Sequence, residues 1–160
     1  MRALLIALIA SAGLARAAIA AEPPPAAREV RAFMARVEEA SRARDLERIT
    51  AALAADCRIE LRALIQGHEQ VTLLTRAEYV EMLTSGYAAL RDLERYDYRV
   101  TGLKITLDTE PPGATVESEV HESFVSGGRP FATLSHETAR VERRGGELKL
   151  VAVSSETEER

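Results

Sequence analysis

The C-terminal half of the sequence constrains the fold most, because its residues alternate between polar and apolar with no helical period. Two glycine pairs, Gly127-Gly128 and Gly145-Gly146, interrupt the alternation. Such pairs suit two-residue hairpin turns, which require positive φ at their central positions. At Gly102 the alternation that begins at Tyr96 slips by one residue, as a β-bulge would produce. The sequence therefore predicts a long antiparallel meander from Tyr96 to Ser155.

Helical signals dominate the region before Tyr96. Apolar residues at helical spacing predict a helix over residues 26–44, and Asp45 can cap a short second helix. Thr75-Arg76-Ala77-Glu78 is a capping box that opens a third helix. The apolar stripe of that third helix consists of Tyr79, Val80, Leu83, Tyr87, Leu90 and Leu93.

A short hairpin is predicted between the second and third helices. Residues 57–61 alternate, residues 66–69 suit a turn, and residues 70–74 suit a second strand. Helices followed by strands favour an α+β fold, with the three helices packed on one face of a curved antiparallel sheet.

The chain begins with the features of a secretory signal peptide. Arg2 precedes an uncharged apolar run over residues 3–14, and Ala18-Ile19-Ala20 offers small residues for cleavage. The run is too short for a membrane span, which needs roughly 20 residues. We therefore expect a signal peptide over residues 1–20, a proline-rich spacer over 21–25, a domain over 26–156 and a polar tail over 157–160. The mature protein would be periplasmic or secreted.

The order of elements resembles the nuclear transport factor 2-like superfamily, a cone-shaped fold shared by polyketide-cyclase-like proteins, ketosteroid isomerases and scytalone dehydratases. The resemblance covers residues 26–156. It rests on that order, on Ala54-Ala55-Asp56-Cys57-Arg58-Ile59 leading from helix to strand, and on Thr75-Arg76-Ala77-Glu78-Tyr79 opening the third helix. It implies a fold and carries no catalytic residues to this chain.

Charge and cysteine content exclude several classes of function. The net charge of −4 would become −6 once a signal peptide containing Arg2 and Arg16 is removed, which disfavours nucleic acid as a partner. Cys57 is the single cysteine, so no internal disulfide can form, and its alternating neighbours predict a half-buried strand thiol. The three histidines show no metal-ligand spacing, and we expect no metal and no cofactor.

The two hairpins assign residues to the two faces of the sheet. On the face with more apolar residues, carboxylates at Glu122 and Glu137 are costly to bury unless they are paired or wet. They are therefore the candidate catalytic residues, and Glu137 is expected opposite Ser118 and Ser154. The candidate pocket-lining residues are Tyr79, Tyr87, Ser118, Glu122, Thr133, Ser135 and Glu137.

The opposite face carries an apolar strip with charged neighbours. An exposed strip of this kind is typical of a contact surface, and the resembled superfamily commonly pairs through this side of the sheet. We therefore expect a homodimer. The candidate interface residues are Val125, Leu134, His136, Val151 and Val153.

Three classes of function remain open at this point. The favoured one is an exported domain that binds a small apolar molecule in its cone or serves as a non-catalytic accessory module. The second is a cyclase-, isomerase- or dehydratase-like enzyme with Glu122 or Glu137 as general base, which would require a raised carboxylate pKa in a closed cavity. The third is a dimerisation or scaffold domain with a filled cone.

Overall fold

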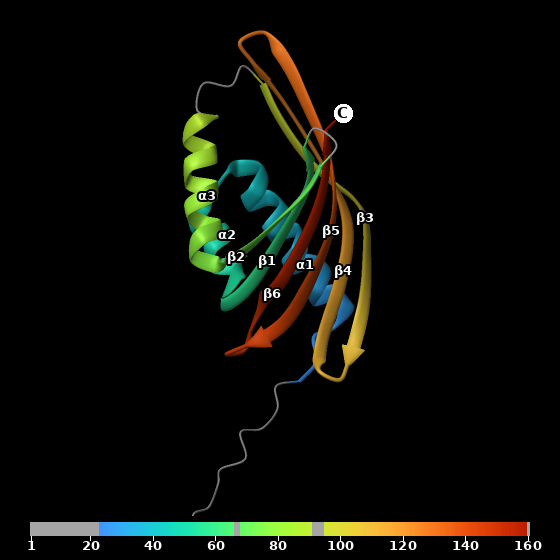
Figure 1. The fold of residues 1–160 in the computed structure, drawn as a ribbon. Coiled ribbons are helices and arrows are strands. Elements are labelled where there is room, and N and C mark those ends of the chain that lie inside the picture. The colour runs from blue at the N-terminus through green and yellow to red at the C-terminus, as the bar shows by residue number, and fades with distance from the viewer. Residues whose placement is uncertain (1–22, 66–67, 91–94, 160) are drawn as a thin grey trace, which may run out of the picture.

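One curved sheet and three helices make up the described part of the chain (Figure 1). The computed structural model describes residues 23–65, 68–90 and 95–159, so the expected signal peptide lies outside the described residues. The helices are α1 (Ala27–Ala43), α2 (Leu46–Ala52) and α3 (Arg76–Ala89). The strands are β1 (Leu53–Ile65), β2 (His68–Thr75), β3 (Arg95–Thr109), β4 (Pro112–Ser126), β5 (Arg129–Arg144) and β6 (Glu147–Glu159).

The predicted helix starts are confirmed by their capping contacts. The Asp45 side chain accepts a hydrogen bond of 3.0 Å from the Arg48 backbone amide at the start of α2. At α3 the Thr75 hydroxyl accepts from the Glu78 amide at 3.3 Å, and the Glu78 carboxylate accepts from the Thr75 amide at 2.8 Å. These contacts satisfy amides that have no partner within the helix.

The apolar stripe predicted for α3 is shorter and less buried than expected. The helix ends at Ala89, none of its residues is fully buried, and Leu93 lies outside the described residues. Tyr79 and Val80 nevertheless pack against the main core.

The sheet is mixed, which corrects the prediction of a purely antiparallel one. The strand order is β2-β1-β6-β5-β4-β3, and β1 pairs with β6 in parallel. All the other neighbouring strands are antiparallel. The first strand after α3 is β3, which lies at the edge of the sheet opposite to β2. The strands β4, β5 and β6 then follow in order toward β1, and β6 runs in the same direction as β1. Local alternation could not reveal this pairing, because it joins opposite ends of the domain.

Both glycine-pair turns and the bulge in β3 are confirmed. Gly127 and Gly128 have φ of 56° and 73°, and Gly145 and Gly146 have φ of 60° and 84°. The β3–β4 register shifts between Thr101 and Lys104, where Gly102 has φ of 65°.

A second bulge, in β6, changes the predicted face of several residues. The β5–β6 register shifts between Arg140 and Val141, which leaves Val151 without a paired residue on β5. Beyond it, Val153 pairs with Ala139 on β5 and with Ile59 on β1, both of which are core residues. Val153 therefore lies on the inner face, not on the outer strip as predicted. Ala152 and Ser154 accordingly belong to the outer face.

The same bulge corrects the predicted partner of Glu137. Ser155, rather than Ser154, lies opposite Glu137, while Ser118 opposes it on β4 as expected. β6 runs to Glu159, so residues 157–159 belong to the sheet and do not form the expected polar tail.

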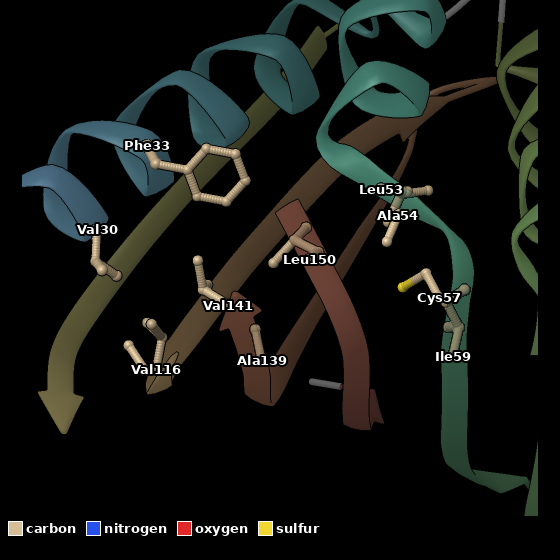
Figure 2. Packing of buried hydrophobic residues seen from close by; sticks show 11 residues of the cluster. Val30, Phe33, Leu53, Ala54, Cys57, Ile59, Val116, Ala139, Val141 and Leu150 are labelled. Carbon is tan, nitrogen blue, oxygen red and sulfur yellow. The ribbon is translucent and has the colours of Figure 1, made fainter. Parts of the chain in front are cut away.

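The main core lies between α1 and the inner face of the sheet (Figure 2). Phe33 and Val30 project from α1 toward Val141 and Leu150, and Ile59 closes the cluster from β1. Ile59 and Val141 are 1% and 0% exposed. The helix α3 contacts β1 and β2, whereas α1 contacts β3 (Figure 1). The candidate residues Glu122 and Glu137 lie on the inner face between these two helices.

Candidate functional site

Two carboxylates occupy the inner face beyond the main core. Glu122 on β4 pairs with Tyr98 on β3 and with Thr133 on β5, so all three belong to the same face. Glu137 lies two residue pairs further along the same face, opposite Ser118 and Ser155. The prediction that both carboxylates point inward from the sheet is confirmed by this register.

All four tyrosines of the chain surround these carboxylates. Tyr96 and Tyr98 come from β3, and Tyr79 and Tyr87 come from α3. Tyr79 interacts electrostatically with Glu137, Tyr87 and Glu122, and Tyr96 forms a side-chain hydrogen bond with Glu122. The pKa of each of the four phenols is raised, first by burial and then by a nearby carboxylate. The phenols therefore stay protonated and can donate hydrogen bonds at physiological pH.

Glu137 has the most perturbed carboxyl group among the described residues. Burial raises its pKa from 4.5 to about 7, the hydrogen bond from Ser155 opposes the rise, and the charge of Glu122 adds to it. Its side chain retains partial exposure because it lines a cavity. A carboxyl group with this pKa exchanges a proton near neutral pH.

The cavity at Glu137 has a volume of about 130 Å³ and lies between α1 and strands β3, β4 and β5. Its apolar wall comes from α1 and β3 and consists of Met34, Ala35, Val37, Val100 and Leu103. Glu137, Ser118 and Tyr98 give it a polar end, while Arg31 and Glu38 contribute charged groups from α1. Glu38 already accepts hydrogen bonds from Arg42 at 2.6 Å and from the Val100 amide at 3.4 Å.

The structure places the predicted pocket residues in different surroundings. Ser118 and Glu137 line the cavity, and Tyr79, Tyr87 and Glu122 belong to the adjoining polar cluster. Thr133 lies beside Glu122 on the same face. Ser135 is 9% exposed, and its hydroxyl is 2.8 Å from that of Thr157, so its hydrogen-bonding capacity is used within the sheet.

Sequence reasoning missed Tyr96 and Tyr98 as site residues. Both share the parity of Val100 on β3, which faces the cavity, so the alternation already contained the signal. The α1 side of the cavity gave no such signal, because Met34 and Val37 are residue types found in any ordinary hydrophobic core.

The structure places Cys57 inside the protein and two of the histidines on the outer face of the sheet. The Cys57 side chain is 2% exposed, and burial raises the pKa of its thiol to about 11. His121 and His136 lie on the outer face, with ring nitrogens 3.7 Å and 4.0 Å from the Glu119 carboxylate. Among the described residues no three side chains of histidine, cysteine, aspartate or glutamate gather as metal ligands would.

No helix in the described ranges is long and apolar enough to cross a membrane.

The outer face differs from the predicted apolar strip. Val151 and Val153 pack against the core, and Leu134, between His121 and Glu158, is only 4% exposed. Val125 is half-buried and His136 is exposed. A broad groove of about 800 Å³ instead runs along this face between β2 and β5, and Leu73 on its edge is 72% exposed.

Comparison with known proteins identifies the fold alone. No protein-family profile matches the sequence, and no curated protein is significantly similar to it. A conserved protein from Planctomyces limnophilus DSM 3776 superposes with a TM-score of 0.66 at 16% identity, over 83% of this chain and 96% of that one.

Two solved NTF2-like proteins give similar results. The one from Rhodospirillum rubrum ATCC 11170, of unknown function in nutrient uptake, has a TM-score of 0.58 at 22% identity, over 79% of this chain and 96% of that one. The one from Cytophaga hutchinsonii ATCC 33406 has a TM-score of 0.61 at 13% identity, over 82% of this chain and 98% of that one. These likenesses confirm the expected α+β fold, except that the sheet is mixed and not purely antiparallel.

Proposed function

From the nuclear transport factor 2-like fold that the chain shares with these structures, we propose that it binds a small, mainly apolar molecule in the cavity at Glu137. One observation carries the proposal: the cavity combines an apolar wall from α1 and β3 with a polar end formed by Glu137, Ser118 and Tyr98. A few placed polar groups in an apolar hollow are typical of small-molecule sites.

The volume limits the size of the ligand. A cavity of about 130 Å³ is close to the ~150 Å³ apolar cavities that accept benzene. The ligand that fits without rearrangement is therefore a single ring or a short chain. Below pH 7 the protonated Glu137 carboxyl, together with the Tyr98 and Ser118 hydroxyls, can donate hydrogen bonds to a carbonyl or hydroxyl oxygen.

Ligand-detected NMR with cyclohexanone, a ring that carries one carbonyl acceptor, tests the proposal. We expect binding to the wild type and loss of binding in Ser118→Leu, which adds bulk at the polar end. Ser123→Leu on the outer face of β4 is the matched control and should bind normally, provided that both variants keep the circular-dichroism spectrum of the wild type. Absence of binding to the wild type, or equal binding by both variants, would contradict the proposal.

A second candidate function is acid–base catalysis by Glu137, favoured by its pKa of about 7 beside the Tyr98 hydroxyl. A general base with that pKa could remove a proton from the carbon next to a bound carbonyl, and a phenol could stabilise the resulting oxyanion. Exchange of the α-protons of cyclohexanone in D₂O measures this step. Catalysis requires exchange faster than in buffer, lost in Glu137→Gln while binding persists; exchange at the buffer rate rules it out for this ketone.

We also propose export and self-association as the setting of this site. Export rests on the signal-peptide features of residues 1–20. N-terminal sequencing of the mature protein should begin at Ala21 or Glu22, and recovery of intact Met1 would contradict export. Self-association into a homodimer is supported by apolar exposure on the outer face, where Val71 and Leu73 of β2 are 50% and 72% exposed.

A further inference from the structure

A third hollow lies on the other side of α1, away from the Glu137 cavity. It is a groove of about 590 Å³ bounded by α1, α2 and the β5–β6 turn. Its apolar lining consists of Ala32, Phe33, Val37, Ala51, Ala52 and Leu148. Its volume lies within the range of roughly 300–1,000 Å³ that is typical of ligand sites.

Four basic side chains from four different elements line this groove. They are Arg36 on α1, Arg48 on α2, Arg143 on β5 and Lys149 on β6. The acidic residues of the lining are Glu29 and Glu147, so the lining has two positive charges in excess. This local sign is opposite to the net charge of −4 of the whole chain. The groove is therefore a place where an anion is favoured on a protein that otherwise repels anions.

Two of these cations are fixed in position by the fold. Lys149 donates to the Ala51 carbonyl at 2.7 Å and pairs with Glu147 at 2.8 Å. Arg143 donates to the Gly146 carbonyl at 3.1 Å and pairs with Glu29 at 3.2 Å. Their side chains are only 23% and 19% exposed. Because they are half-buried and held by backbone carbonyls and by one carboxylate each, their positions in the groove are preorganised.

Arg36 differs from its neighbours because none of the described carboxylates pairs with it. Its guanidinium donates to the Ala32 carbonyl at 3.3 Å and lies 5.9 Å from the centre of the Phe33 ring. Arg48 pairs at 3.0 Å with Glu39, which is not part of the groove lining. The Arg36 guanidinium thus retains donors for an oxyanion, the group that arginine binds in bidentate fashion.

We propose that this groove binds a small organic anion, in which a phosphate or carboxylate group is attached to an apolar body. The oxyanion contacts Arg36 and Lys149, and the apolar body packs along Val37, Ala52 and Leu148. This site is independent of the Glu137 cavity: the two hollows share Val37 but no polar residue.

Titration calorimetry at low ionic strength tests the proposal with phenyl phosphate and phenylacetate, which distinguish the two oxyanions on the same ring. Benzylamine and benzyl alcohol supply the same ring with a cation or with no charge. We expect at least one anion to bind and neither control compound to do so. Arg36→Gln should weaken anion binding about ten-fold or more, as the loss of a charge-assisted hydrogen bond implies.

Arg28→Gln is the matched control, because Arg28 is an exposed arginine on α1 that lines neither hollow. Anion affinity in this variant should stay within about two-fold of the wild type, as for an exposed charge. Ser118→Leu should also leave anion binding unchanged, which separates this site from the Glu137 cavity. The proposal is overturned if neither anion binds, if benzyl alcohol binds as tightly, or if Arg36→Gln and Arg28→Gln have equal affinities.

Discussion

Glu137 and Glu117 are carboxylates on neighbouring strands of one sheet, and the face on which each lies gives it a different environment. Glu117 is on the outer face, where it is 51% exposed and pairs with Lys104 at 2.6 Å. Glu137 is on the inner face, enclosed by α1, β4 and β6, and burial raises its pKa to about 7. Ionisation of Glu137 therefore costs free energy in the folded protein that it does not cost in the unfolded chain.

The pH dependence of stability should reveal this residue. Between the ordinary carboxyl pKa of 4.5 and the folded value of about 7, the folded protein holds a proton that the unfolded chain has released. The free energy of unfolding should therefore fall as the pH rises through this window, and less so in Glu137→Gln. Urea unfolding at pH 5 and pH 8 measures the difference.

The exposed Glu81 of α3 supplies the control for that measurement, since Glu81→Gln should keep the wild-type pH dependence. If Glu137→Gln and Glu81→Gln show the same change in stability between the two pH values, Glu137 does not have the raised pKa.

At the level of elements, the side chain of Arg140 on β5 links that strand to the turn between β3 and β4. Arg140 donates to the Pro111 carbonyl at 2.7 Å and pairs with Asp108, which also accepts from Thr115 at 3.1 Å. Gly113 leaves the space that this guanidinium occupies. A Cβ built at Gly113 would lie 2.7 Å from Arg140 Nη2 and 2.8 Å from the Val141 carbonyl oxygen.

Substitutions of two glycines should consequently shift stability in opposite directions. Gly113→Ala should lower the free energy of unfolding by about 1–3 kcal/mol, because the backbone of Val141 cannot yield cheaply. Gly86→Ala in α3 should raise it by about 0.5–1 kcal/mol, because nothing lies within 4 Å and alanine favours the helix. Urea denaturation of both variants checks the signs. A stable Gly113→Ala protein would show that the turn can move away from β5.

Elements with local signals could be predicted from the sequence, and those set by distant contacts could not. Thr75, Asp45 and the glycine pairs act within a few residues, and the caps and turns predicted from them are confirmed. The bulge at Val151 has no such signal, because Leu150 and Ala152 are apolar on one parity and Val151 and Val153 on the other. Only packing against β1 selects between them. The bulge affected the candidate site in the same way. Glu137 was predicted correctly as an inner-face residue, but its partner on β6 was predicted as Ser154 and is Ser155.

For the whole molecule, the outer face of the sheet is notable because it carries Leu73, the most exposed of the large hydrophobic residues in the described ranges. Val71 and Leu73 project from β2, which is an edge strand of the sheet. The adjoining groove is lined by Leu73, Ala152 and polar residues from β5. Edge strands with exposed apolar residues invite pairing with another chain, so we place the proposed dimer contact here rather than at Leu134.

Light scattering at micromolar concentration tests this contact. The wild type should have the mass of a dimer, and Leu73→Glu should have the mass of a monomer, because the substitution would bury a charge in the interface. Leu107→Glu on the opposite edge strand is the control, since Leu107 is 48% exposed and lies away from the groove. A monomeric wild type would remove the dimer, and a dimeric Leu73→Glu would place the contact elsewhere.

The strand β6 lies beside the candidate site, and this has a practical consequence for work on this protein. Ser155 and Thr157, within the last six residues, contact Glu137 and Ser135 on the inner face. An affinity tag or fusion partner attached directly after Arg160 would follow a strand that supports the site, and trimming the terminus would remove part of it. An N-terminal tag would be lost wherever a signal peptide is cleaved. Recombinant protein is therefore best produced with residues 155–159 kept unchanged and with a removable tag in place of residues 1–20.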